Sequence, residues 1–279
     1  MLNLIRIELF KLYSKWRTYI GFIAIGILFP LILYLIKVEG ESFIDGEIRK
    51  VGKDFLISGN LFNAWIITEF VMNSLWVHVP FLIVLVSGDM LSSEATSGTY
   101  RLSLIRPISR TEFFLAKYTA TLIYVASLII FMFIISVGLG LFLFGSGDLI
   151  SIDDGIFAII PESEALWRII FAFTLAIISM WVVATLAFLI SSFVENAIGP
   201  IIGTMVVVVA FLIISNIPVA SVEPYKPYLF TTHSSVWRDA FSFEINYEKI
   251  FDSVIALGIN ILILLSIAYV IFIRKDIRS

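Results

Sequence analysis

The sequence predicts an all-α polytopic membrane protein: a bundle of six transmembrane helices with an N-terminal amphipathic interfacial helix and a short cytoplasmic helix. Of the 279 residues, 59% are hydrophobic and 15% are charged, whereas soluble proteins average about 45–50% and about 25%. The mean hydropathy of +1.01 points the same way. Six apolar runs reach the roughly 20 residues that cross a bilayer. Such unbroken runs favour helices over the alternating ~10-residue strands of membrane barrels.

Residues 1–17 are predicted to form the interfacial helix. Such a helix lies along the membrane surface with its bases toward anionic headgroups, so membrane lipid is one expected partner. Its apolar stripe, at spacings of three and four, is Leu2, Ile5, Leu9, Leu12 and Trp16, and the bases Arg6, Lys11, Lys15 and Arg17 lie away from that stripe. The alternative is a simple basic flank that sets the orientation of the first span.

Six spans follow within a single transmembrane domain. Their predicted ranges are 18–36, 61–87, 118–144, 165–190, 197–217 and 251–273. Formal charge interrupts them only at Glu69, Arg168 and Asp252. Arg168 and Asp252 lie near span ends, where a charged side chain can extend to the interface. Pro30 and Pro80 are expected to kink the first and second spans.

Basic residues favour a cytoplasmic location for both termini. Six spans place the termini on one side of the membrane. The segments on that side hold 11 lysines and arginines: 1–17, 88–117, 191–196 and 274–279. The segments on the other side hold seven: 37–60, 145–164 and 218–250. Because lysine and arginine accumulate in cytoplasmic loops, we expect a multi-pass protein of the cytoplasmic (inner) membrane with both termini inside.

The cytoplasmic segment 88–117 has the signals of a short helix between two breaks. Gly98 can close a helix that continues the second span, and Thr99 can cap the next one. Pro107 disfavours helical backbone in the residue before it and ends the short helix. Ser109 and Glu112 then match a capping box that begins a new helix. The alternative is an ordinary hydrophilic loop. However, the short helix would expose apolar residues, which favours an interpretation as a docking site for a partner. These residues are Tyr100, Leu102, Leu104 and Ile105.

In this segment the chain resembles the membrane permeases of type-two ABC exporters. The matching pattern is a glutamate, a Gly-Thr pair, a few apolar residues, a Pro-x-Ser-Arg group and a lysine: Glu94, Gly98, Thr99, Leu102, Leu104, Pro107, Ser109, Arg110 and Lys117. The resemblance implies a coupling helix that docks onto a separate ATPase subunit, with Tyr100 and Arg101 in the same interface. It also implies a dimer, formed with a second copy or with a sister permease.

The chain itself shows no nucleotide-binding motif. The nearest match to a Walker A motif is Gly52-Lys53, which is followed by Asp54 where serine or threonine is required. ATP and Mg are therefore expected on the partner subunit, with no cofactor, metal or catalytic residue in this chain. The absence of cysteine excludes disulfides and thiolate metal sites. A net charge of −3 is too small to indicate a nucleic-acid partner.

Two other functions compete with the ATP-driven exporter. A proton-driven channel or carrier usually keeps several buried acids, and the spans offer at most one. An intramembrane enzyme needs convergent catalytic groups, and the spans contain no His-Glu-x-x-His and no Gly-x-Ser-x-Gly motif. The sequence therefore favours the exporter subunit.

Glu69 and Asn73 are candidate polar residues of a translocation path. They lie one helical turn apart on the same face, near the outer end of the second span. Alternatively, the apolar part of the span begins at Phe70 and Glu69 lies in water. His78 falls on roughly the opposite face and is not expected to share a site with Glu69. The external segment 218–250 is rich in proline and aromatic residues and is expected to lie on or dip into the outer membrane surface, as a cap or an external gate.

Overall fold

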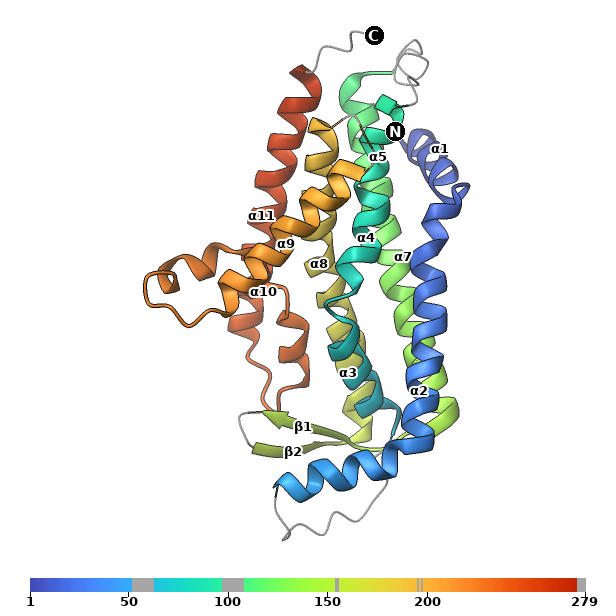
Figure 1. The fold of residues 1–279 in the computed structure, drawn as a ribbon, viewed down its shortest axis with the longest axis vertical. Coiled ribbons are helices and arrows are strands. Elements are labelled where there is room, and N and C mark those ends of the chain that lie inside the picture. The colour runs from blue at the N-terminus through green and yellow to red at the C-terminus, as the bar shows by residue number, and fades with distance from the viewer. Residues whose placement is uncertain (52–62, 97–107, 154–155, 195, 197, 275–279) are drawn as a thin grey trace.

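The helices form an elongated bundle (Figure 1). The computed structural model describes residues 1–51, 63–96, 108–153, 156–194, 196 and 198–274. Met1 and Arg274, the last residue of the final helix, lie at the same end of the bundle, which we call the terminal end. The opposite end carries a small β-hairpin, and we call it the hairpin end.

Two helices begin the chain, α1 (Leu2–Tyr13) and α2 (Trp16–Val51). The turn between them is held by Thr18, whose buried hydroxyl donates to the Leu12 carbonyl. α1 packs against α7 at the terminal end, and α2 packs along α7 and α4. Pro30 lies inside α2, which continues as a helix beyond it. The part of α2 that is apolar enough to cross a membrane is Trp16–Val38.

The predicted second span is divided into two helices. α3 (Ala64–Leu75) and α4 (Val79–Ser87) meet at an angle of 59°. Pro80 lies in the first turn of α4, where its missing N–H is tolerated, but a continuous helix would need that N–H to donate to the Trp76 carbonyl. The kink expected at Pro80 is therefore confirmed. α5 (Asp89–Thr96) continues toward the terminal end (Figure 1).

α8 (Glu162–Phe193) is the central helix. It packs against α4, α7 (Arg110–Phe144), α9 (Ile198–Asn216) and α11 (Tyr247–Arg274). In its most apolar stretch 67% of the residues are buried, compared with 11% in α11. Small residues permit this close packing in lipid, where helix association depends on van der Waals contact. Five fully buried alanines supply them: Ala165, Ala172, Ala176, Ala184 and Ala187.

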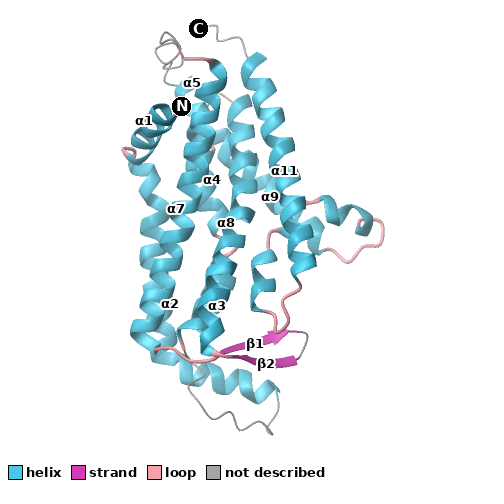
Figure 2. Ribbon diagram, turned by 180° about the vertical axis from the view of Figure 1, so that it is seen from behind, coloured by secondary structure: helices cyan, strands magenta, loops and turns pink. Residues whose placement is uncertain are grey.

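A two-stranded hairpin is added to the otherwise helical fold (Figure 2). β1 (Leu149–Asp153) and β2 (Ile156–Ile160) are antiparallel, and Leu149 pairs with Ile160. Gly145 ends α7 with a φ of +72°, a conformation that glycine adopts readily, and the chain then turns into the hairpin. The sequence predicted only a connecting segment over 145–164. Isoleucines in both strands suit extended backbone, but two five-residue strands between long apolar spans give only a weak pattern.

The segment between α9 and α11 folds against the bundle. It forms η1 (Glu223–Tyr228), α10 (Phe230–His233) and η2 (Val236–Phe241), and η2 packs on α8. Trp237 is fully buried, with its ring 5.1 Å from that of Trp76 at the break between α3 and α4. Tyr228, in contrast, is 77% exposed. The aromatic residues of this segment therefore divide between the core and the surface of the protein.

Arg168 is buried within the protein. Its side chain is buried and donates to the Ser242 carbonyl at 2.6 Å and to the Glu164 carboxylate at 3.0 Å. The carbonyl of Phe243 accepts a further, longer bond at 3.4 Å. The guanidinium thus fixes the chain between η2 and α11 onto α8.

Candidate functional site

The predicted site for docking of an ATPase includes residues 97–107, which connect α5 to α7 in the sequence. Seven of its predicted residues lie outside the described part of the chain: Gly98, Thr99, Tyr100, Arg101, Leu102, Leu104 and Pro107. The helices that lead into and out of this segment are described, and with them Glu94, Ser109, Arg110 and Lys117. The described part of the site consists of those two helices and their neighbours.

Four charged side chains from three helices form what we call the ion-pair cluster: Glu8 and Lys11 of α1, Glu94 of α5 and Lys117 of α7. Lys117 lies between the two carboxylates, with its Nζ atom 2.7 Å from Glu8 Oε2 and 2.8 Å from Glu94 Oε1. Lys11 contacts the same carboxylates, at 2.8 Å from Glu8 and 3.4 Å from Glu94. Two acids and two bases thus cancel in formal charge.

Three members of the ion-pair cluster are withdrawn from solvent. Glu8 and Lys117 are each 2% exposed and Glu94 is 9% exposed, whereas 44% of the Lys11 side chain is exposed. Buried charges are costly unless they are paired and hydrogen-bonded. Lys117 also lies 5.0 Å from the centre of the Phe113 ring, in a cation–π contact. Because removal of one partner would leave a buried charge uncompensated, the cluster ties α1, α5 and α7 into one arrangement.

Glu8 and Lys11 are both ionised at neutral pH. Burial alone would raise the pKa of the Glu8 carboxyl, but the Lys117 ammonium and hydrogen bonds from Lys11 and Lys117 hold that pKa below its usual value of 4.5. Burial would likewise lower the pKa of Lys11, but its hydrogen bond and attraction to Glu8, with the Glu94 charge, raise that pKa above its usual value of 10.5.

We expect Glu8 to lose its stabilising contribution in acid. Because the pKa of Glu8 is lower in the folded than in the unfolded protein, the ionised carboxylate stabilises the fold fully above pH 4.5 and progressively less as the pH falls below it. The melting temperature of the purified protein should exceed that of Glu8→Gln above pH 4.5, and the two should converge below it. A difference that is constant across the whole pH range would contradict this role for Glu8.

α5 is also fixed on two other sides. Asp89, at its start, forms an ion pair with Arg17 of α2 at 2.9 Å. On the side of α8, the Ser191 hydroxyl oxygen accepts the backbone amides of Leu91 and Ser92, at 3.1 and 2.9 Å. These amides lie in the first turn of α5, where a helix provides no acceptors of its own. A side chain from the end of α8 therefore docks the start of α5.

α7 is anchored at its first residues. The Ser109 hydroxyl accepts the Glu112 amide at 3.1 Å, and the Glu112 carboxylate accepts the Ser109 amide at 3.2 Å, so the predicted capping box is confirmed. Arg110 donates to the Ile273 carbonyl at 3.1 Å, in the last turn of α11. The cation thereby satisfies a carbonyl that the end of a helix leaves without an intrahelical donor.

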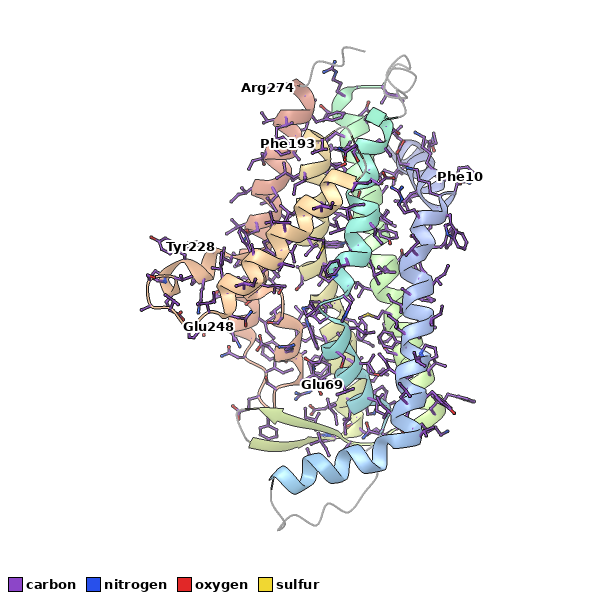
Figure 3. The ribbon with its side chains drawn as sticks, in the orientation of Figure 1. Phe10, Glu69, Phe193, Tyr228, Glu248 and Arg274 are labelled. Carbon is purple, nitrogen blue, oxygen red and sulfur yellow. The ribbon has the colours of Figure 1, made fainter. Side chains whose placement is uncertain are left out.

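Glu69 and Asn73 lie apart from this site. Both belong to α3, and Figure 3 shows Glu69 toward the hairpin end. The Asn73 side-chain amide donates to the backbone carbonyl of Glu69 at 3.2 Å rather than to its carboxylate. His78 is exposed in the break between α3 and α4. The structure therefore keeps these residues on α3 and at its end, and brings none of them to the ion-pair cluster.

Glu8 is the member of the ion-pair cluster that the sequence analysis missed. It is the only acid among residues 1–17, and it sits one turn before Lys11 in a helix expected to be basic and apolar. Its partner Lys117 is 109 residues away. A lone acid in a basic interfacial helix was the available signal. The cluster holds no nucleophile, and the described residues contain no group of three or more metal-ligating side chains; what it can do is join helices.

The apolar helices define the class: a multi-pass, predominantly α-helical membrane protein. The chain belongs to the DUF2705 family, described as protein of unknown function, and the family model matches residues 17–278. The chain is also 26% identical over 206 residues to the uncharacterized protein YhcI of Bacillus subtilis (strain 168). That alignment covers 71% of this chain and 64% of YhcI.

Proposed function

We propose that the chain is the membrane-spanning permease subunit of an ATP-driven ABC exporter, which forms the translocation path and couples to a separate ATPase subunit. The resemblance of Glu94–Lys117 to type-two permeases supports this proposal. ATP and Mg would bind to the ATPase, and Glu69 and Asn73 would contribute polar groups to the path. The alternatives are an ATP-independent channel or carrier and an intramembrane enzyme.

Six crossings would suit this role. Five described helices are long and apolar enough to span a membrane, and the bent pair Ala64–Leu75 and Val79–Glu94 would be the sixth. An even number agrees with the position of Met1 and Arg274 at one end (Figure 1). The excess of lysine and arginine in the segments on that side, 11 against seven, favours a cytoplasmic location for them in the inner membrane. We further propose a dimer, with a second copy or a sister permease.

The fixation of both helices that border residues 97–107 is the observation that carries the proposal. α5 is held through Glu94 in the ion-pair cluster and through the Ser191 hydroxyl. α7 is held through Lys117 of the same cluster and through Arg110 at the end of α11. When both ends of a connection are fixed on packed helices, movement of a partner bound to it shifts those helices, because packed cores do not deform continuously. A loosely attached loop would absorb the movement instead.

Co-purification with the ATPase tests this docking. The partner to use is an ATPase with a Walker A motif encoded beside this gene, co-expressed with the full chain. Leu102→Asp should weaken its capture by at least about tenfold, because a desolvated unpaired charge costs several kcal/mol and about 1.4 kcal/mol is tenfold. Leu102→Met is the matched control, since it keeps an apolar side chain of similar size, and it should leave capture unchanged. Membrane insertion, followed as protein level, should be equal in all three proteins.

ATP hydrolysis separates the proposal from its alternatives. The purified chain alone should neither bind nor hydrolyse ATP, and hydrolysis and export in vesicles should require the ATPase. Nucleotide binding by the chain alone would contradict the two-subunit arrangement, and transport without the ATPase would favour the channel or carrier. Parental capture and transport by Leu102→Asp would show that the segment is only a loop.

A further inference from the structure

A pocket of about 590 Å³, lined by several charged residues, lies where the segment between α9 and α11 meets the start of α11. Residues from α10, η2 and α11 line it, and six of them carry ionisable side chains: His233, Arg238, Asp239, Glu248, Lys249 and Asp252. Figure 3 shows Glu248 on the side of the bundle where this segment projects, below Tyr228. The volume is in the range of small-molecule sites.

Half of these groups are already paired within the protein. Lys249 forms an ion pair with Asp239 at 2.7 Å. Both ring nitrogens of His233 are engaged, Nδ1 with the Ser253 hydroxyl at 3.1 Å and Nε2 with the Pro227 carbonyl at 2.9 Å. These contacts fix the positions of His233, Asp239 and Lys249 in the pocket wall.

Three charges in the pocket form no ion pair among the described residues: Arg238, Glu248 and Asp252. The Arg238 guanidinium lies over the Trp237 ring, 5.5 Å from its centre, and is attracted at longer range by Glu69. Glu248 and Asp252 are four residues apart on α11 and therefore lie on one face of it. Although they line the same pocket as Arg238, neither pairs with it. The pocket thus offers a cation and two anions that are held apart.

The start of α11 sets the depth of this pocket in the membrane. Asp252 is followed by an uncharged run from Ser253 to Ile273. At 1.5 Å per residue, about 20 helical residues span the hydrocarbon core of about 30 Å. The charged first turns of α11 therefore lie at the level of the lipid headgroups. Exposed aromatic rings, which favour that level, occur close in sequence to the residues that line the pocket: Tyr225, Tyr228, Tyr247 and Phe251 are 66%, 77%, 62% and 65% exposed.

We propose that this pocket binds a phosphoethanolamine group, such as the headgroup of phosphatidylethanolamine. Glu248 and Asp252 would accept hydrogen bonds from the primary ammonium, and Arg238 would donate to the phosphate, for which a guanidinium is suited. A choline headgroup has no N–H to donate to the carboxylates. An anionic headgroup without an amine would leave both carboxylates uncompensated. The inference rests on the pocket and on the membrane class of the protein, and not on the proposed transport function.

Lipid retention tests the inference. The full chain, purified in detergent, is mixed with phosphatidylethanolamine, phosphatidylcholine or phosphatidylglycerol of identical acyl chains, and retained lipid is counted by native mass spectrometry. Phosphatidylethanolamine should be retained at least about tenfold better than the other two, given the strength of hydrogen bonds to charged groups. The double variant Glu248→Gln with Asp252→Asn should abolish this preference. Arg238→Gln should weaken retention of both phosphatidylethanolamine and phosphatidylglycerol.

Glu244→Gln is the matched control, because Glu244 is an exposed acid of the same connection that does not line the pocket. It should retain the parental preference, and melting temperatures should confirm that all variants are folded. Soluble phosphoethanolamine is tested in parallel. Binding of the lipid alone would assign the site to a membrane headgroup, and binding of the soluble compound alone would assign it to a free ligand. Either result would support a phosphoethanolamine site in this pocket. Two results would overturn the proposal. The first is equal retention of the three lipids by the parent, with no binding of soluble phosphoethanolamine. The second is an unchanged preference for phosphatidylethanolamine in the double variant.

Discussion

Lys117→Met is expected to lower the free energy of unfolding by about 3–5 kcal/mol, the cost of breaking a buried ion pair from one side. Lys117 is 2% exposed and is shared by Glu8 and Glu94. Methionine fills a similar volume, so the loss arises from the charge and not from a cavity. The carboxylates would then depend on Lys11, which is partly exposed and lies 3.4 Å from Glu94. Thermal or denaturant unfolding of the purified protein measures the change.

Two further variants separate the buried charge from a general effect of removing lysine. Lys249→Met breaks the ion pair with Asp239, in which Lys249 is 63% exposed, and should change stability by no more than about 1 kcal/mol. Lys117→Met combined with Glu8→Gln should recover part of the loss, because one of the two uncompensated carboxylates is removed. If the two lysine variants have the same effect, or the double variant is no better than the single one, the ion-pair cluster does not hold these helices together.

Trp237→Ala is expected to cost about 3–5 kcal/mol and to release η2 from α8. Trp237 is fully buried and contacts Trp76 and Phe241, with ring centres at 5.1 and 6.1 Å. Alanine would leave a cavity at the point where the segment between α9 and α11 meets the break in the second span. Unfolding measurements give the energy, and limited proteolysis between α9 and α11 reports the release, since cleavage should become faster.

Two substitutions calibrate that result. Trp237→Phe should be milder, because the indole Nε1 atom has no hydrogen-bond partner in the described structure and phenylalanine removes volume but no bond. Tyr228→Ala, at a residue that is 77% exposed, should stay within about 0.5 kcal/mol of the parent. Unchanged proteolysis in Trp237→Ala would mean that other contacts, such as those of Arg168, are sufficient to hold the segment.

Local signals predicted the parts of the site that depend on neighbouring residues. The capping box needs only Ser109 and Glu112, three residues apart, and it forms as expected. Pro80 likewise acts on its own turn of helix and divides α3 from α4. The partners of these residues are three or four residues away along the chain. Sequence patterns therefore describe them without any knowledge of the packing.

The ion-pair cluster could be predicted only in part. Glu94 and Lys117 were identified through a family resemblance, but their pairing with each other and with Glu8 requires three helices to meet at one point. Arg168 shows the same limit: its position near a predicted span end does not indicate that its side chain is buried and bonded to the carbonyl of Ser242. The sequence does not specify which distant carbonyl or carboxylate a long side chain will reach.

The sequence by itself determined that this is a membrane protein with long apolar helices, that its second span bends at Pro80 and that α7 begins at a capping box. Those properties follow from the length of apolar runs and from caps and prolines that act within a few residues. Only the tertiary structure decided that Glu8 would be buried beside Lys117 and that Trp237 would enter the core. Each of these outcomes depends on which faces of distant helices pack together. In lipid that choice is made by van der Waals fit and by the pairing of buried polar groups, neither of which has a period along the chain.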